Sequence, residues 1–345
     1  MSLNRRELLK LAGVSFVLAS CGSLRRKVPY KERVYSGYAN GKEVGLKIIS
    51  PQDTKIIPLK NEIHSVAYSS KYDVKVFIPK LNLVSYYQIQ DGPIVALHPE
   101  EGNHFYGHGV FDEKRNVLYT TQSKIKPTEK DPGYIHVYSV PDFKLVDKFV
   151  SYGGGPHDLL IVRDELIVCN GGAHPNVAHI DLSNRKLLKL FSVDLKHVSF
   201  THCDQIDEEN FVIGTTTRDL NEVCPLYHLN LKAGLTQYES NGDLAEILMR
   251  FQLLSVLSYD NHVLVTCPAT NSLLVWNKDR KFVGGHNIAN VASLVYSKTH
   301  QGVIVGSGDP KTPVYLAQFI MGSLKLTPLD WGEEALASGS HSLIV

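Results

Sequence analysis

The chain has 345 residues, of which 36 are basic and 35 acidic, so its formal net charge is +1 at pH 7. Hydrophobic residues make up 43% of the sequence, which is typical of a soluble globular body, and no run of like charge indicates binding to nucleic acid. Past the N-terminus, no apolar segment is long enough to cross a bilayer as a helix.

The N-terminus has the pattern of a bacterial export signal. The segment Asn4-Arg5-Arg6-Glu7-Leu8-Leu9-Lys10 resembles a twin-arginine signal, and a short apolar stretch over residues 11–19 follows it. Leu18-Ala19-Ser20-Cys21 resembles a lipobox, in which the cysteine is lipidated and becomes the first residue of the mature protein. We therefore expect residues 1–20 to be a signal peptide and residues 21–32 to be a tether lipidated at Cys21.

These two motifs together predict a lipid-anchored protein of the bacterial envelope that faces the periplasm. Gly22 follows the cysteine in place of the aspartate associated with retention in the inner membrane, so the outer membrane is the expected location. A twin-arginine signal also implies that the protein folds before export.

In the remaining chain, residues 33–345, a short apolar strand recurs at steps of 38 to 52 residues, and a histidine leads it in most repeats. Periods of this length, filled with short strands, are typical of β-propeller blades. The seven residues that mark the repeats are His64, His108, His157, His202, Leu254, Ala292 and His341. The sequence therefore predicts an all-β fold, a single seven-bladed β-propeller.

The last repeat stops soon after its first strand, at Val345. Further strands are expected at 33–38, 44–49 and 54–59, so the N- and C-terminal strands together are predicted to close the seventh blade. Second and third strands are expected after the marked ones, and a helix over residues 243–250. His136, His179 and His228 fall on third strands, where we expect ordinary cross-strand contacts.

If each marked strand is the innermost of its blade, the five marked histidines surround one central axis. Imidazole is the commonest protein ligand for transition metals. The sequence thus predicts a metal site formed by His64, His108, His157, His202 and His341, for iron or another transition metal, whose affinity falls as the pH drops through about 6. The alternative is that these histidines only cap the inner strands. With three methionines, the chain does not have the composition of a soft-ligand copper(I) carrier.

Four cysteines remain besides Cys21, and none of them forms a CxxC pair, which argues against a structural zinc site. Cys169 and Cys267 lie in apolar runs and are expected to be buried. Cys203 and Cys224 are the nearest pair in sequence, and the sequence leaves open whether they form a disulfide. Strand alternation is expected to point Cys203 away from the axis.

Several segments closely resemble the DUF1513 family of bacterial exported propellers. The segments are His104-Phe-Tyr-Gly-His108-Gly-Val-Phe, Leu118-Tyr-Thr-Thr, Gly155-Pro-His157-Asp-Leu-Leu and Asn170-Gly-Gly172. Members are similar to seven-bladed, YVTN-like propellers and are often encoded beside imelysin-type iron-uptake proteins. The resemblance implies a role in iron or metal acquisition with an imelysin-type or similar envelope partner. It also implies secondary ligand-binding positions at His104, expected in the loop that enters blade two, and at Asn170.

The leading hypothesis is therefore a lipid-anchored propeller that binds a metal ion or metal complex at its histidine cluster and serves iron acquisition. Two alternatives stay open: a propeller enzyme, lactonase-like or quinoprotein-like, and a docking scaffold with structural histidines. No Ser-His-Asp order, HExxH motif, phosphate loop or CxxCH motif is present, so no catalytic residues are assigned.

Overall fold

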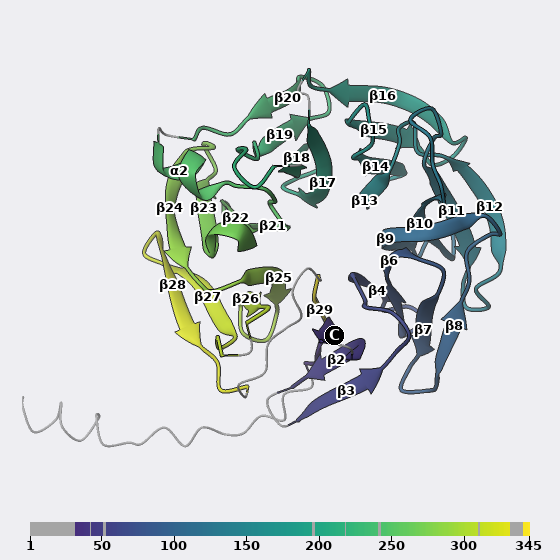
Figure 1. Ribbon diagram of the computed structural model, residues 1–345, viewed down its shortest axis with the longest axis horizontal. Coiled ribbons are helices and arrows are strands. Elements are labelled where there is room, and N and C mark those ends of the chain that lie inside the picture. Colours follow the sequence, from purple (N-terminus) through teal and green to yellow (C-terminus); the bar gives the residue numbers. More distant parts are fainter. Residues whose placement is uncertain are drawn as a thin grey trace, which may run out of the picture. The chain divides into compact units, whose positions relative to one another are not determined.

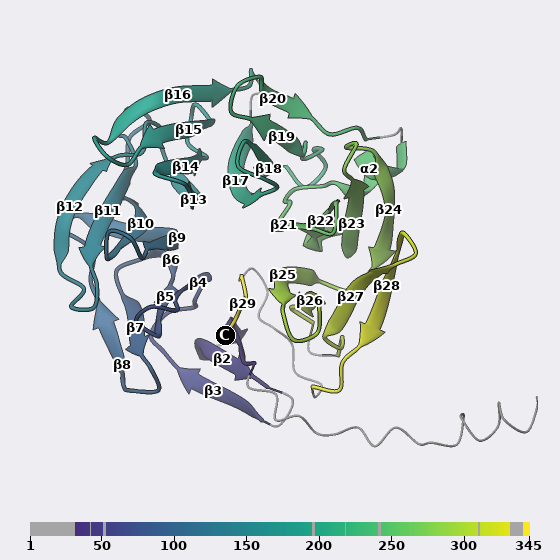
Figure 2. The ribbon, with the colours of Figure 1, turned by 180° about the vertical axis from the view of Figure 1, so that it is seen from behind.

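The computed structural model describes residues 32–345, except 42, 51–52, 195–196, 218, 241–242, 310 and 332–340. Cys21, the export signal and the tether up to residue 31 lie outside the described residues. The described strands form seven antiparallel sheets that follow one another around a ring, seen from its two faces in Figures 1 and 2. This arrangement confirms the predicted seven-bladed β-propeller.

The first three blades contain the elements that build the site. Blade one consists of β4 (Ser65–Ser69), β5 (Val74–Ile78), β7 (Ser85–Ile89) and β8 (Ile94–Leu97). Blade two consists of β6 (Lys80–Asn82), β9 (Asn103–Asp112), β10 (Val117–Lys124), β11 (Tyr134–Ser139) and β12 (Leu145–Val150). Blade three consists of β13 (Pro156–Val162), β14 (Glu165–Asn170), β15 (Asn176–Asp181) and β16 (Lys186–Ser192).

The next three blades repeat the same four-stranded pattern. Blade four consists of β17 (Val198–Gln205), β18 (Asn210–Thr217), β19 (Tyr227–Asn230) and β20 (Gly234–Gln237). Blade five consists of β21 (Ser255–Tyr259), β22 (His262–Cys267), β23 (Ser272–Asn277) and β24 (Phe282–Asn287). Blade six consists of β25 (Val291–Ser297), β26 (Gly302–Ser307), β27 (Tyr315–Ile320) and β28 (Ser323–Pro328). The predicted helix is α2 (Asp243–Leu248), and a short 3₁₀ helix spans Pro268–Thr270.

Blade seven joins the two ends of the described chain. Its order is β29 (Leu343–Ile344), β1 (Val34–Asn40), β2 (Glu43–Ile49) and β3 (Thr54–Pro58). In β1, Val34 pairs with Ile344 and Tyr35 with Leu343, and β29 contacts both β25 and β4. The closure of the last blade by N- and C-terminal strands is therefore confirmed, and the inner strands form a closed circle with β29 between blades six and one.

The burial of each strand follows its depth in the blade. The second strands are almost continuously apolar and buried, as in β14, because they pack between two neighbouring blades. The outermost strands, such as β16, face solvent along most of their length. Apolar clusters fill the space between adjacent blades, so the core is a ring of inter-blade layers around the axis.

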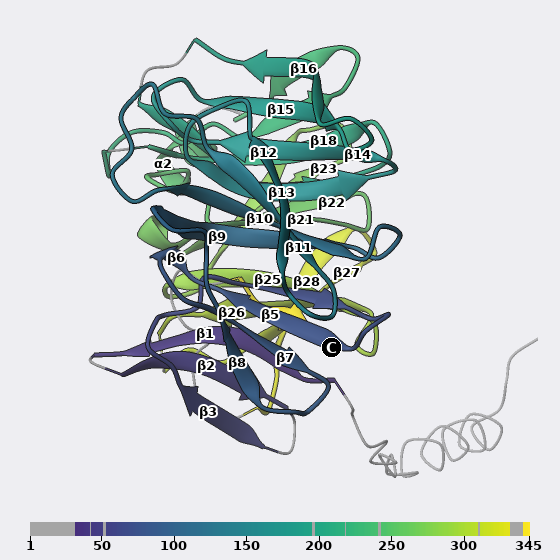
Figure 3. The ribbon, with the colours of Figure 1, turned by 90° about the vertical axis from the view of Figure 1, so that its right-hand side faces the viewer.

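One strand departs from the four-stranded repeat. β6 lies in the connection between two strands of blade one, yet it pairs with β9 and so adds a fifth strand to blade two. β6 and α2 lie on one face of the ring, and the C-terminus lies on the opposite face (Figure 3). Among the helices that the structure describes, none is long and apolar enough to cross a membrane.

All four described cysteines are free thiols. Cys203 packs with Cys169 in the layer between blades three and four, whereas Cys224 packs with Cys267 in the layer between blades four and five. The pair considered from sequence, Cys203 with Cys224, is therefore separated by the sheet of blade four and does not form a disulfide. Cys169 and Cys267 are fully buried, as expected.

Candidate metal centre

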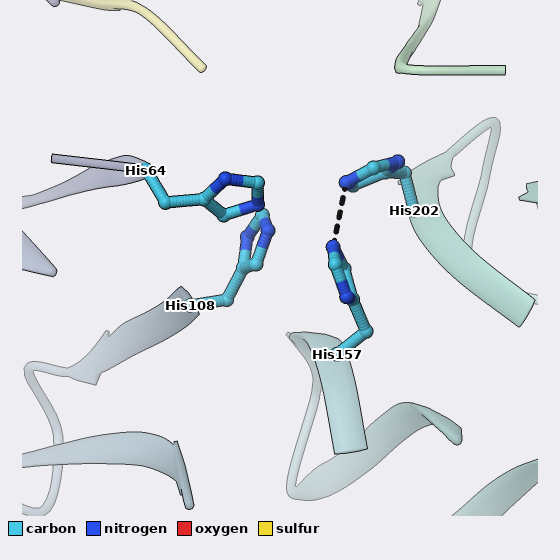
Figure 4. A group of neighbouring side chains, drawn as sticks. All are labelled: His64, His108, His157 and His202. Carbon is cyan, nitrogen blue, oxygen red and sulfur yellow. Dashed lines mark hydrogen bonds between the residues drawn. The ribbon is translucent and has the colours of Figure 1, made fainter. Parts of the chain in front are cut away.

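The innermost strands bring all five marked histidines to the axis. The ring centroid of His202 lies 4.4 Å from that of His341, 4.6 Å from that of His157 and 5.5 Å from that of His108. His64 is 5.0 Å from His108 and 5.3 Å from His157 by the same measure. Figure 4 shows His64 and His108 facing the pair of His157 and His202 across a small gap. One ligand atom from each of His64, His108, His157 and His202 lies within 4.8 Å of the others.

A β-bulge aims three of these side chains inward. The register of pairing with the next strand shifts at His108 in β9, at His157 in β13 and at His202 in β17. A bulge inserts extra residues into one strand and turns their side chains out of the normal alternation, and bulges are frequent beside functional sites. The same shift occurs at Ala292 in blade six, so the bulge is also found in a blade that places no imidazole there.

Thr121, on β10, stabilises two of the bulges. Its hydroxyl oxygen lies 3.2 Å from the backbone nitrogen of His108, which donates to it. The same hydroxyl lies 3.2 Å from the carbonyl oxygen of His108 and 3.3 Å from that of His157. One buried side chain therefore positions the backbone of both residues, and it joins blade two to blade three at the site.

The ring of His108 is held by a carboxylate. Its Nδ1 lies 3.0 Å from Asp158 Oδ1, while Asp158 Oδ2 accepts a hydrogen bond of 3.0 Å from the backbone N–H of Cys203. Burial opposes ionisation of Asp158, but His108 and the Cys203 N–H outweigh it and keep the pKa of this carboxyl below its usual value. The carboxylate accepts a hydrogen bond from the N–H at Nδ1 of His108. The lone pair on Nε2 of this ring therefore faces the cluster. This carboxylate–histidine pairing is the usual support of a metal-ligating imidazole.

A backbone carbonyl determines the tautomer of His202 in the same way. Nδ1 of His202 lies 3.3 Å from the carbonyl oxygen of Leu253, which can only accept, so the ring proton is on Nδ1. Nε2 of His202 then accepts the 2.9 Å hydrogen bond from Nε2 of His157, shown dashed in Figure 4. A metal ion between these rings would replace that hydrogen bond, and the proton of His157 would move to its Nδ1.

The polar atoms of the cluster fit a metal ion. Nε2 of His108 and Nε2 of His341 are buried and have no hydrogen-bond partner among the described residues, which is unfavourable unless a ligand is present. Four nitrogens around a tetrahedral ion at about 2.05 Å are about 3.4 Å apart. The Nε2 atoms of His157 and His202 are 2.9 Å apart, and the ligand atoms of all four residues lie within 4.8 Å of one another. These distances lie on either side of the tetrahedral spacing, so small rotations of the rings would bring the four nitrogens to it.

Burial favours the neutral form of three of these imidazoles by lowering their pKa values, and the neutral form is the one that binds metals. Desolvation, with a contribution from the cation of Lys80, lowers the pKa of His157 well below its usual value, and desolvation and the neighbouring histidines do the same for His202. Desolvation lowers the pKa of His341 to about 3. Protons should therefore compete for His157, His202 and His341 only at a lower pH than the value of about 6 expected from an unperturbed imidazole.

The remaining predicted site residues have different positions. His341 contacts the other rings but lies outside the group of four whose nitrogens converge. His104 is a buried residue of β9 rather than of the preceding loop, and its Nδ1 bonds the carbonyl oxygen of Phe105. Asn170, at the end of β14, donates to Ser151 O at 3.0 Å and to Asn176 Oδ1 at 2.9 Å, and so supports the connection into blade three. Neither residue belongs to the four-histidine group.

Four residues near the cluster were not identified from the sequence: Asp158, Thr121, Lys80 and Tyr106. Asp158 directly follows His157, so strand alternation alone would point it away from the axis, and only the bulge at His157 changes that direction. Lys80 approaches the cluster on β6, a strand outside the repeat. The ring of Tyr106 meets the edge of His157 with centroids 6.3 Å apart. Tyr106, Thr121 and Asp158 fall within segments that resemble the family, but nothing in the sequence indicated their contacts with the cluster, and Lys80 lies in none of these segments.

Comparison with known proteins gives the family. The model of a family described as "Protein of unknown function (DUF1513)" matches residues 57–331. The chain belongs to this family. The match covers β4 to β28 and four of the five clustered histidines, and it confirms the resemblance seen in the sequence. No curated protein matches this member of the DUF1513 family.

Solved structures similar to this DUF1513 protein are propellers of low sequence identity. The periplasmic gluconolactonase PpgL of Pseudomonas aeruginosa is 12% identical, with a TM-score of 0.65 over 91% of this chain and 99% of that chain. The WD40 β-propeller domain of Doa1 is 15% identical, with a TM-score of 0.59 over 81% and 87% of the two chains. A chain of the mitotic checkpoint complex is 12% identical, with a TM-score of 0.58 over 77% and 78%. At these identities the similarity shows the fold and carries no activity.

Proposed function

We propose that this protein binds one divalent transition-metal ion in the propeller axis, with His64, His108, His157 and His202 as ligands. The observation that carries the proposal is the convergence of one ligand atom from each residue within 4.8 Å. Imidazole nitrogens suit iron, zinc, copper and nickel, whereas magnesium and calcium prefer oxygen ligands. His341 contacts three of the same rings and is the nearest candidate for a fifth ligand.

The second argument is that the tautomers are already suited to coordination. Asp158 and the Leu253 carbonyl hold the Nδ1 protons of His108 and His202, and both Nε2 atoms point into the cluster. The buried Nε2 of His108 has no hydrogen-bond partner among the described residues, so its lone pair is available to a ligand.

We further propose that this binding serves iron acquisition in the bacterial envelope, with the protein anchored through Cys21 and facing the periplasm. The support is the twin-arginine pattern, the lipobox and the resemblance to exported propellers encoded beside imelysin-type proteins. The described chain begins beside its C-terminus, where the backbones of Arg33 and Val345 bond each other at 2.8 and 3.0 Å. The start of the described chain therefore lies beside the C-terminus, on the face opposite β6 (Figure 3).

Isothermal titration of chelator-treated protein tests the binding. Fe²⁺ under anaerobic conditions, Zn²⁺ and Co²⁺ should each bind at one equivalent per chain, and Mg²⁺ and Ca²⁺ should not bind. His174→Ala, which removes an exposed histidine outside the group, should leave stoichiometry and affinity unchanged. Absence of stoichiometric binding by all three transition metals would contradict the proposal and favour a docking scaffold. Metal analysis of protein purified from its native envelope then identifies the ion.

A further inference from the structure

The imidazoles of the cluster and the side chains beside them differ in their exposure to solvent. His157 and His202 are 3% and 1% exposed, whereas His64 and His341 are half-buried. Tyr106 is also half-buried, and Lys80 is exposed. Two accessible side chains therefore lie beside a buried imidazole: the ring of Tyr106 contacts that of His157, and the charge of Lys80 lowers the pKa of His157.

Lys80 and Tyr106 lie directly opposite each other in the ladder between β6 and β9. Residues that pair in this way project their side chains to the same face of the sheet. The ring of Tyr106 contacts both His104, at a centroid distance of 5.7 Å, and His157, at 6.3 Å. The shared face of Lys80 and Tyr106 is therefore the face turned toward the histidine cluster.

Both side chains have unused hydrogen-bond donors. No hydrogen bond or ion pair joins the Lys80 ammonium or the Tyr106 hydroxyl to another residue in the described part of the chain. Gly155 keeps the space beside the hydroxyl open, because a Cβ atom at that position would lie 3.1 Å from the Tyr106 oxygen. Its φ of +56° also favours glycine there. The two donors therefore face an accessible space at the edge of the cluster.

The charges around a bound metal ion are unbalanced. Four neutral imidazoles leave a divalent ion with its full charge, and the nearest carboxylate is Asp158, which pairs with His108. The ammonium of Lys80 adds a further positive charge at the same side. Two uncompensated cations in a partly dehydrated site repel each other strongly, unless an anion lies between them.

We propose that the metal binds together with an oxyanion that coordinates the ion through one oxygen and accepts hydrogen bonds from Lys80 and Tyr106 through the others. This inference rests on the proposed function and specifies its ligand: a metal–oxyanion complex rather than a bare ion. An inorganic anion, such as phosphate or bicarbonate, and the carboxylate of an organic chelator share this chemistry.

Anion titration of the Co²⁺-loaded protein at pH 7, followed by the cobalt absorption bands, tests the inference. Inorganic phosphate, bicarbonate and acetate serve as separate probes, and the tightest one distinguishes an inorganic anion from a carboxylate. The loaded parent should give a saturable spectral change at one equivalent of anion, and the metal-free parent should bind none. Lys80→Met and Tyr106→Phe should weaken anion binding at least about tenfold, which corresponds to the loss of a charge-assisted hydrogen bond.

Lys80→Met should still bind Co²⁺ itself, as tightly as the parent or more tightly, because the variant removes a like charge. Lys126→Met, which neutralises an exposed lysine in the same blade, is the matched control and should bind both ligands normally. If the loaded parent responds to none of the three anions, or if Lys80→Met responds like the parent, the oxyanion inference is overturned while metal binding stands. If the parent takes up no Co²⁺, the proposed function and this inference fail together.

Discussion

Replacing Asp158 with asparagine should weaken metal binding without removing a ligand. The carboxylate accepts two hydrogen bonds of 3.0 Å, from Nδ1 of His108 and from the N–H of Cys203. An asparagine has one acceptor oxygen, so if that oxygen keeps the Cys203 N–H, its NH₂ group faces the His108 ring. The ring then carries its proton on Nε2, the atom that would otherwise bind the metal.

The expected loss for Asp158→Asn is therefore at the upper end of the range for residues that support a ligand. That range is about 10- to 100-fold in metal affinity, or about 1.4 to 2.7 kcal/mol. Titration calorimetry with Zn²⁺ measures the change, and thermal unfolding of the metal-free variant checks that the fold persists.

The matched control for this prediction is Asp204→Asn. Asp204 is also a half-buried carboxyl of an inner strand, and it accepts a 2.6 Å hydrogen bond from the backbone N–H of Ser258. This variant should keep the parent affinity because Asp204 supports none of the four ligands. Equal affinities of Asp158→Asn and the parent, or equal losses in both variants, would refute the assignment of Asp158 as the support of His108.

Three further perturbations test separate parts of the account. His136 is fully buried, and burial lowers its pKa to about 4. As the pH falls below about 6.5, the unfolded chain therefore binds a proton at this histidine before the folded protein does. This difference lowers the free energy of unfolding. His136→Phe should therefore lose about 3 kcal/mol less unfolding free energy than the parent between pH 7 and pH 4, measured by urea unfolding; an unchanged loss would contradict this. Gly107→Ala should weaken Zn²⁺ binding, because the new Cβ would lie 2.7 Å from Cδ2 of His64. Gly102→Ala is the control, because Gly102 also has a positive φ but no atom lies within 4 Å of its added Cβ. Equal Zn²⁺ affinities of the two variants would exclude a role of Gly107 in leaving room for the His64 ring. Cys21→Ser should move the protein from the membrane to the soluble envelope fraction, and unchanged partitioning on cell fractionation would rule out lipidation at this thiol.

The blade pattern could be predicted from the sequence because each strand depends on local residues. Turn residues and period-two alternation predicted second strands after the marked ones, and the structure has them, for example β14 and β26. The closure of blade seven followed from counting strands at the two ends of the chain. The convergence of the marked histidines followed from the same repeat, because equivalent positions of a closed ring share one axis.

The chemistry next to the imidazoles could not be predicted in the same way. A bulge reverses the direction of the following side chains, so alternation alone did not place Asp158 against His108. Lys80 belongs to β6, a strand that one blade contributes to the next, and a repeat of equivalent blades does not contain such a strand. The separation of Cys203 from Cys224 depends on which face of blade four each side chain occupies, and sequence proximity does not report that.

The most direct test of the central claim is Zn²⁺ titration of the parent beside the double variant His108→Ala/His157→Ala. These two ligands come from different blades, and one threonine hydroxyl supports both backbones. The account predicts one equivalent of bound metal for the parent and no stoichiometric binding for the double variant, with both proteins folded by circular dichroism. A double variant that binds zinc as tightly as the parent would contradict the metal centre and leave the histidines a structural role.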